Sequence, residues 1–221
     1  MAEQTDTTAA PRGNAGREPL NRGVIAEAAL RLAEAAGLEE LTMRALASEL
    51  GAGTMTLYTH VRGRDDLLQA IVERLIAELD MPGVTARAGG DWREHLAEVL
   101  DAYKSLAERF PRSFELLALA PYADGPVAPH LASAERALIA GGLHPSDARV
   151  ALGTADAFAT GFLVVRARTA LRAEGPGAAA ASHSPLAYAR GVAAVIAGIA
   201  ATLEETPNVE GSGQGAATAG V

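Results

Sequence analysis

Residues 51–68, GAGTMTLYTHVRGRDDLL, combine side chains that can bind nucleic acid. Threonine, tyrosine and histidine can hydrogen-bond to phosphates or base edges, a methionine can touch a thymine methyl group, and arginines pair with phosphates. No acidic residue occurs from Gly51 to Arg64, although the chain holds 27 acids against 19 bases. The candidate DNA contacts of this segment are Thr54, Met55, Thr56, Tyr58, Thr59, His60, Arg62 and Arg64.

The surrounding pattern predicts three short helices that would hold these side chains. An apolar stripe that starts near residue 20 ends at Gly37, and Thr42 is a suitable N-cap for a second helix that ends at Gly51. Thr54 can cap a third helix that reaches about His60. A tight glycine turn between two such helices is typical of a helix–turn–helix, whose second helix enters the major groove. The start of the second predicted helix adds three candidate contacts, Thr42, Met43 and Arg44.

A purely structural interpretation of the same segment stays open. Tyr58 and His60 could cover a core, and the two arginines could simply be solvated. The net charge of −8 also argues against a nucleic-acid partner, because a basic footprint is the usual sign of one. However, the first 64 residues carry 7 basic and 8 acidic side chains, so most of the acidity lies in the remainder of the chain. Local phosphate contacts matter more than the total charge.

The whole chain has the pattern of an all-α protein. Alanine is abundant, only 4% of the residues are aromatic, and no stretch alternates like a strand. After the third helix, Asp65 and Asp66 suit the first turn of a longer helix to about residue 79, and residues 84–90 resemble a linker. We predict a disordered tail at 1–18, a helix–turn–helix domain with a connecting helix at 19–80, a larger helical domain at 84–205, and a disordered tail at 206–221.

Several classes of protein are not indicated by the sequence. Without cysteine there is no disulfide or zinc–thiolate site, and no two of the five histidines have the spacing of a helical metal site. No phosphate loop, nucleophile elbow or paired-carboxylate motif indicates an enzyme, so we expect no cofactor and no metal. The polar start is unlike a signal peptide, and we expect no apolar run that approaches the ~20 residues of a membrane span. We expect a cytoplasmic protein with no membrane partner.

The segment LTMRALASELGAGTMTLYTHVRGRDDLLQAIVERL, with AEAALRLAEAAGLEE before it, resembles the DNA-binding domain of the tetracycline-repressor (TetR) family of transcriptional regulators. The resemblance covers about residues 21–79 without a gap, and LYTHVRGRDDLL is its most specific part. It implies that Tyr58 and His60 contact phosphates and that Arg62 and Arg64 face the DNA backbone. It also implies that the helix from Arg64 connects this domain to a ligand domain.

The resemblance further implies that a homodimer binds a pseudo-palindromic operator in double-stranded DNA. In the family, two helices of each rear domain form the dimer interface. Small residues at helical spacing here, which let two backbones approach closely, are the candidates. An alanine-rich surface that reflects coding bias is the alternative. The candidate interface residues are Gly153, Ala157, Gly161, Gly191, Ala194, Gly198 and Ala201.

A small organic effector in the rear domain is the last partner that the resemblance implies. Residues 92–121 are also similar to the ligand domain of the tetracycline repressors, but no histidine lies near Leu116, which argues against magnesium–tetracycline as the effector. The candidate pocket residues are Trp92, Tyr103, Phe110, Phe114, Leu117, Tyr122, Phe158 and Phe162. The sequence thus predicts a ligand-responsive repressor, and a helical interaction module or an all-α enzyme without DNA binding are the alternatives.

Overall fold

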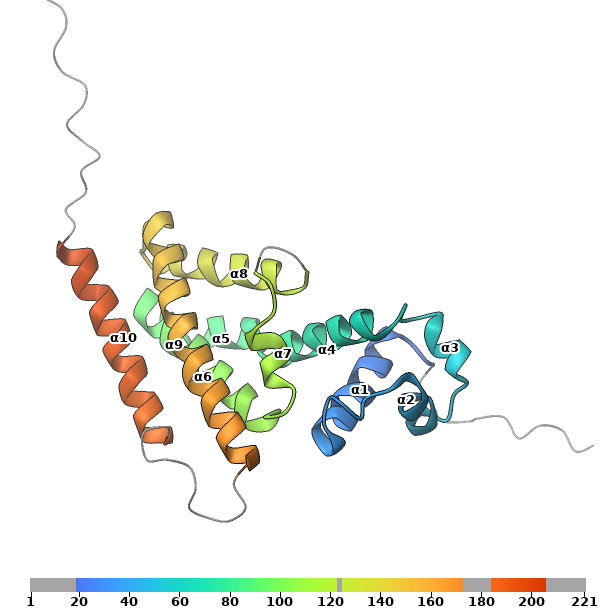
Figure 1. The fold of residues 1–221 in the computed structure, drawn as a ribbon. Coiled ribbons are helices and arrows are strands. Elements are labelled where there is room, and N and C mark those ends of the chain that lie inside the picture. Colours follow the sequence, from blue (N-terminus) through green and yellow to red (C-terminus); the bar gives the residue numbers. More distant parts are fainter. Residues whose placement is uncertain (1–18, 123–124, 173–183, 206–221) are drawn as a thin grey trace, which may run out of the picture.

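The computed structural model describes residues 19–122, 125–172 and 184–205, and within these ranges the chain forms helices joined by short turns, with no strand. The all-α prediction is therefore confirmed. The molecule is elongated, with α3 at one end, α10 at the other, and α4 running between the two halves (Figure 1). The two predicted disordered tails, 1–18 and 206–221, lie outside the described residues.

Three short helices form the front of the molecule: α1 (Arg22–Ala36), α2 (Met43–Leu50) and α3 (Thr54–Tyr58). Each of the first two begins at a polar cap. The side chain of Asn21 accepts a hydrogen bond from the Val24 amide, and that of Thr42 accepts one from the Ala45 amide. Gly51 ends α2 with a left-handed backbone (φ 56°), a conformation that favours glycine and permits the tight turn into α3.

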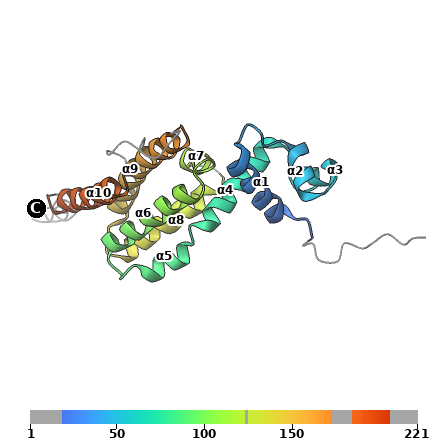
Figure 2. The same cartoon turned by 90° about the horizontal axis from the view of Figure 1, so that it is seen from below.

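Helix α4 (Arg64–Glu78) joins the front to the rear. Leu67, Ile71, Leu75 and Leu79 recur at every fourth position, and all four are buried. This spacing places them along one face of the helix. Packing against α1 near its start and against α7 and α8 farther along makes α4 part of both halves (Figure 2). A single buried apolar cluster consequently extends from Ile25 in α1 to Leu163 in α9.

The rear consists of the remaining helices. These are α5 (Met81–Arg87), α6 (Trp92–Arg109), α7 (Phe114–Ala118), α8 (Val127–Ala140), α9 (Pro145–Arg172) and α10 (Pro185–Glu205). Helix α6 packs against α5, α8, α9 and α10, so it lies at the centre of this half. Helices α9 and α10 run side by side at the far end of the molecule (Figures 1 and 2).

Two boundaries differ from the sequence expectations. The start of the expected linker at 84–90 is helical, because Asp80 caps α5 by accepting a hydrogen bond from the Gly83 amide. Helix α3 ends at Tyr58, two residues early, and begins after Gly53, so Thr54 is its first residue and no side chain caps it. Caps and ends are set by local hydrogen bonds, which an apolar pattern does not reveal.

The expectation that no apolar segment is long enough to span a membrane was wrong. Helix α9 and residues Pro185–Glu204 of α10 are long and apolar enough by length and composition alone. Alanine, valine and leucine are frequent in both helices, and Asp156 is the single charged residue between Arg149 and Arg166 of α9. In the most apolar 18-residue segment of each helix, only 28% of α9 and 11% of α10 is buried. Much of this apolar surface therefore has no cover within one chain. Such a surface needs a partner.

Position 141, directly after α8, requires glycine because its backbone lies very close to the backbone of Trp92 at the start of α6. The Trp92 amide donates to the Gly141 carbonyl (3.2 Å). A Cβ at position 141 would lie 2.7 Å from the Trp92 nitrogen and 2.9 Å from its Cα, atoms that cannot turn away. The Gly141 backbone itself (φ −79°, ψ 6°) is open to any residue, so the constraint is purely steric.

We therefore expect Gly141→Ala to lower the free energy of unfolding by about 1–3 kcal/mol, the usual effect of overpacking. Urea denaturation followed by circular dichroism measures the change. Gly53→Ala is the matched control, because a Cβ there meets only Thr56 Oγ1 at an ordinary 3.5 Å. Equal loss of stability in both variants would contradict the steric argument.

Candidate nucleic-acid interface and effector cavity

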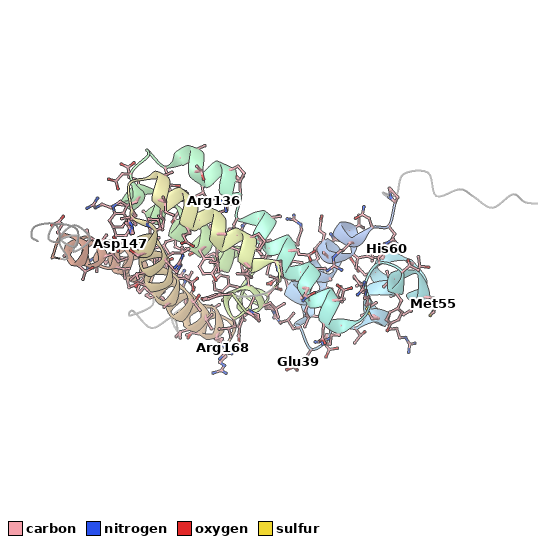
Figure 3. All side chains as sticks on the ribbon, turned by 90° about the horizontal axis from the view of Figure 1, so that it is seen from above. Glu39, Met55, His60, Arg136, Asp147 and Arg168 are labelled. Atoms are coloured by element: carbon pink, nitrogen blue, oxygen red, sulfur yellow. The ribbon has the colours of Figure 1, made fainter. Side chains whose placement is uncertain are left out.

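Helix α3 presents its side chains outward at the end of the molecule farthest from α10. Met55 is 78% exposed and Tyr58 45% exposed, which is unusual for large apolar or aromatic residues. Thr56, Thr59 and Arg62 are also exposed, and Thr54 and His60 are half-buried. Figure 3 shows Met55 and His60 at this tip, with no part of the rear half near them. The predicted candidates of the third helix are thus brought together on one surface.

The inner side of α3 explains why this surface is fixed in place. Leu57 and Val61 are fully buried against the front core. The Thr59 hydroxyl donates to the Thr56 carbonyl (2.7 Å), which closes the last turn. A helix this short has little stability of its own, so its orientation depends on these two apolar anchors.

The start of α2 adds one accessible candidate and two that serve the fold. Arg44 is exposed beside α3 and can reach a groove or a phosphate. Thr42 uses its hydroxyl as the cap of α2. Met43 is half-buried and packs against the core cluster. The sequence predicted all three as DNA contacts, and of these Arg44 has a side chain that is exposed and is not used as a helix cap or in the core.

Arg64 makes contacts within the protein that the sequence did not predict. Its guanidinium donates to the carbonyl oxygens of Leu41 (2.5 Å) and Leu38 (2.7 Å), in the loop between α1 and α2. These backbone acceptors hold the side chain against the loop, although Arg64 remains exposed. Arg64 thereby fastens the start of α4 to the loop that precedes α2, and its contact with a DNA backbone stays a prediction.

Asp66 holds the connection between α3 and α4. Its carboxylate accepts hydrogen bonds from the Arg62 amide (2.8 Å) and from Arg22 of α1 (2.7 Å), and Arg22 also reaches Glu73 (3.1 Å). The hydrogen bond from the Arg62 backbone, followed by the one from Arg22, lowers the pKa of Asp66 below its usual value. A polar hollow lies beside this network, lined by Arg22, Tyr58, Thr59, His60, Arg62, Asp65, Asp66 and Gln69.

A mainly apolar cavity lies inside the rear half, where α4, α6, α8 and α9 meet. Its volume is about 50 Å³, room for a few water molecules but far below the ~300 Å³ of a typical ligand site. Leu79 and Met81, at the end of α4 and the start of α5, form one wall. The polar groups on the lining are Tyr103, Tyr122, His130 and Asp156.

Three of the predicted pocket residues, Tyr103, Leu117 and Tyr122, line this cavity, and the others do not. Trp92 is buried, with its amide bonded to Gly141 and its ring beneath Arg93. Phe114 belongs to the core, edge-on to Tyr103 at 4.9 Å. Phe110 is half-buried on the core cluster. These placements have one cause: bulky rings fill space, so in this chain they belong to the packed core more than to the cavity wall.

Phe158 and Phe162 belong to an aromatic cluster instead of the cavity. Their rings pack with Tyr188 of α10 at centroid distances of 5.7 and 5.2 Å, and the Tyr188 hydroxyl donates to the Leu100 carbonyl (2.9 Å). Gly191 of α10 sits directly against the Phe158 ring, with no space for a Cβ. The cluster therefore seats α10 on α9 and α6.

His130 and Asp156 are the polar cavity residues that the sequence did not predict. One signal was available for Asp156: it is the only charged residue between Arg149 and Arg166 in α9. A lone acid in such an apolar stretch requires a hydrogen-bonding or charged environment. For His130 the sequence offers no comparable signal.

Comparisons with known proteins agree with the geometry of the front half. The family model "Bacterial regulatory proteins, tetR family" matches residues 25–71, which extend from α1 to the middle of α4. The tetracycline repressor protein class A from transposon 1721 of Escherichia coli is 31% identical over 156 residues, 66% of each chain. The chain belongs to the tetR family. This confirms the resemblance seen in the front sequence and in the rear domain.

Other tetR relatives match less of their own length. The HTH-type transcriptional repressor DrrR1 of Streptomyces coeruleorubidus is 38% identical over 87 residues, so the match spans about a third of that repressor (32%). Among solved structures, TetR from Acinetobacter baumannii AYE has a TM-score of 0.67 at 23% identity, over 83% of this chain and 98% of that one. ActR of Streptomyces coelicolor bound to actinorhodin has a TM-score of 0.66 at 24% identity, over 84% and 98%. These structures share the fold.

Within this tetR chain, the predicted small-residue stripes lie largely on the surface. Gly153, Ala157 and Gly161 of α9 and Ala194, Gly198 and Ala201 of α10 are all exposed. A Cβ on Gly153, Gly161 or Gly198 would meet nothing within 4 Å. Gly191 is the exception, since it faces Phe158 within the same chain. No group of three or more metal-ligating side chains occurs in the residues that the structure describes.

The Asp66 network generates a stability prediction. Because the pKa of Asp66 is lowered in the folded protein, its contribution is present above the unfolded value of about 4 and is lost as the pH falls through the lower folded value. We expect Asp66→Asn to reduce thermal stability at pH 7, and we expect its difference from the parent to shrink as the pH falls below about 4. Asp65→Asn, which makes the same charge change at the adjacent position, should leave the thermal stability nearly unchanged. A difference that persists unchanged at pH 3 would contradict the ionic role of Asp66.

Proposed function

We propose that this protein is a ligand-responsive transcriptional repressor that binds a pseudo-palindromic operator as a homodimer. The observation that carries the proposal is α3, a helix of small and polar side chains, free of acids, held outward on two buried anchors. Membership of the tetR family supports it, as do relatives whose names describe transcriptional repressors.

The surface of α3 suits the major groove. Thr54, Met55, Thr56 and Thr59 face base edges and thymine methyl groups, while Tyr58, His60 and Arg62 face phosphates. Arg44 of α2 reaches a guanine edge or a phosphate. Gly53 offers no side chain to the groove, so bases next to it are read less strictly.

The second step of the proposal is dimerisation through α9 and α10. Val150 and Val165 of α9 and Leu186 of α10 are exposed large apolar side chains on the helices that also carry the exposed small residues. Two copies that pack these faces together bury them in a four-helix arrangement, with the two α3 helices about 34–36 Å apart to fit successive major grooves. This use of the apolar surface makes a membrane partner unnecessary and suits a cytoplasmic protein.

The third step is release of the operator by an organic effector in the rear cavity. At about 50 Å³ the cavity cannot hold a drug-sized molecule unless its walls move apart. Leu79 and Met81 form one of these walls, so an effector displaces the rear end of α4. Arg64 and Asp66 fasten the other end of α4 to the front helices, and the displacement therefore changes the separation of the two α3 helices.

A second link carries motion between the proposed domains, residues 19–80 and 84–205. Glu34 of α1 accepts hydrogen bonds from the backbone amides of Arg112 (3.2 Å) and Ser113 (2.7 Å), just before α7. Arg109 of α6 reaches both the carboxylate and the carbonyl oxygen of Glu78 in α4. The front half thus follows the rear through polar contacts as well as through the apolar core.

A mobility-shift assay on DNA upstream of the protein's own gene tests operator binding. Arg62→Gln should weaken binding and reduce the salt dependence by about one phosphate contact, a slope change of about 0.9 in log K against log salt. Arg136→Gln is the matched control, because it removes the same charge from an exposed position on α8, away from α3 (Figure 3). If Arg62→Gln binds the DNA as tightly as the parent does, the proposed contact is wrong. If the parent binds no DNA, a helical interaction module or an enzyme is favoured.

Sedimentation tests the dimer. Gly198→Arg places a long charged side chain on the exposed stripe of α10 and should yield monomers, because the interface cannot bury it unpaired. Ala132→Arg, on the exposed side of α8, introduces the same side chain outside the proposed interface and should leave the dimer intact. A dimer in both variants would refute this interface, and a parent protein that requires detergent would favour membrane association.

A further inference from the structure

The cavity in the rear half has a distinctive charge: its described lining contains one carboxylate and no lysine or arginine. Asp156 of α9 supplies the carboxylate, and the Tyr122 hydroxyl donates to it. Most other lining residues are aliphatic. The walls come from the end of α4, from α5, α6, α7, α8 and α9, and from the α7–α8 connection, so Asp156 faces a space enclosed on several sides.

Three basic residues on the neighbouring helices bond to acids other than Asp156, and Arg136 of α8 is exposed and does not line the cavity. In α6, Lys104 bonds to Asp101 (3.3 Å) and Arg109 to Glu78 (2.5 Å). Arg149, two turns before Asp156 on α9, bonds to Glu135 (3.0 Å). The remaining polar groups that face the cavity are Tyr103 from α6 and His130 from α8. Burial lowers the pKa of His130, which keeps this imidazole uncharged at neutral pH.

A half-buried carboxylate that meets only a neutral donor is poorly compensated. Burial raises the pKa of Asp156, and the hydrogen bond from Tyr122 opposes that rise. Burial also raises the pKa of Tyr122 to about 12, so the tyrosine donates a proton and does not share the charge. An ionised Asp156 therefore reduces the stability of the empty protein, and a cation placed beside it would recover that loss.

We propose that the effector is a mainly apolar small molecule with a protonated amine, and that Asp156 receives its ammonium group while Tyr103 and Tyr122 flank it. The aliphatic lining takes the hydrophobic body of the ligand. An anionic ligand would meet an uncompensated like charge, and a neutral ligand would leave the carboxylate as poorly paired as before. This inference rests on the proposed function in placing the effector in the cavity, but the charge preference is measurable without DNA.

Isothermal titration calorimetry with matched probes tests the proposal. The probes are 1-naphthylmethylamine, 1-naphthylmethanol and 1-naphthoate, with 9-anthracenylmethylamine and its alcohol as larger counterparts. We expect the amine of each pair to bind at least tenfold more tightly than the alcohol, and the naphthoate to bind most weakly. In Asp156→Asn this preference should fall to within about threefold, with the affinity for the alcohols unchanged.

One further variant and one further measurement separate the charge from the shape of the site. Tyr122→Phe keeps the carboxylate and should retain the preference for amines. Asp156→Asn keeps a side chain that can accept the Tyr122 hydrogen bond, and it should raise the melting temperature of the ligand-free protein at pH 7, because it removes a charge that the fold stabilises poorly. The gain should vanish near pH 3, where the parent carboxyl is protonated.

Several outcomes would overturn the proposal: alcohols that bind as tightly as amines, a preference for the naphthoate, an amine preference that survives in Asp156→Asn, or no binding of any probe. The mobility-shift assay distinguishes failure of the charge preference from failure of the proposed repressor function. Release of the operator by an anionic compound leaves the repressor intact and refutes the charge preference. Tight amine binding in a protein that never binds DNA supports the site and refutes the repressor.

Discussion

The continuous burial of one face of α4 is the constraint on which the rest of the structure depends. Leu67, Ile71, Leu75 and Leu79 form a single apolar stripe, and its two ends lie in different halves of the molecule. Because protein interiors are closely packed, neither half can shift along this helix without opening a void or creating an overlap. The helix that ends at the cavity is thus the same rigid body that begins beside the DNA-facing surface.

Polar contacts at both ends of α4 attach it to specific residues of the front and rear halves. Arg64 and Asp66 hold its start to the α1–α2 loop, to α1 and to the loop after α3, while Glu78 at its end bonds to Arg109. Charge-assisted hydrogen bonds of this kind depend strongly on direction, so they fix orientation more than they add stability. The apolar stripe provides cohesion, and the polar ends determine how a displacement reaches α3.

The sequence predicted the local features of this structure better than those that depend on contacts between distant residues. Helical periodicity and glycine turns identified the front helices, and the acid-free segment identified the outward surface of α3, because these are local properties. The hydrogen bonds from Arg64 to the α1–α2 loop could not be predicted, since its carbonyl partners are more than twenty residues away. The pocket was only partly predicted, because Phe114, Phe158 and Phe162 have the composition of a pocket but pack into the core. A cavity is defined by what neighbouring helices leave unfilled, and no local pattern records that.

The small size of the empty cavity sets the energetics of the proposed repressor. If the wall at Leu79 and Met81 must move before an effector fits, part of the binding free energy is spent on that movement, and the apparent affinity is reduced accordingly. The operator favours the arrangement of α4 that the empty cavity allows, whereas the effector favours the displaced one. Linkage then requires each ligand to weaken the other by the same factor. An ionised Asp156, poorly compensated in the empty state, adds to this difference, because only the bound cation relieves it.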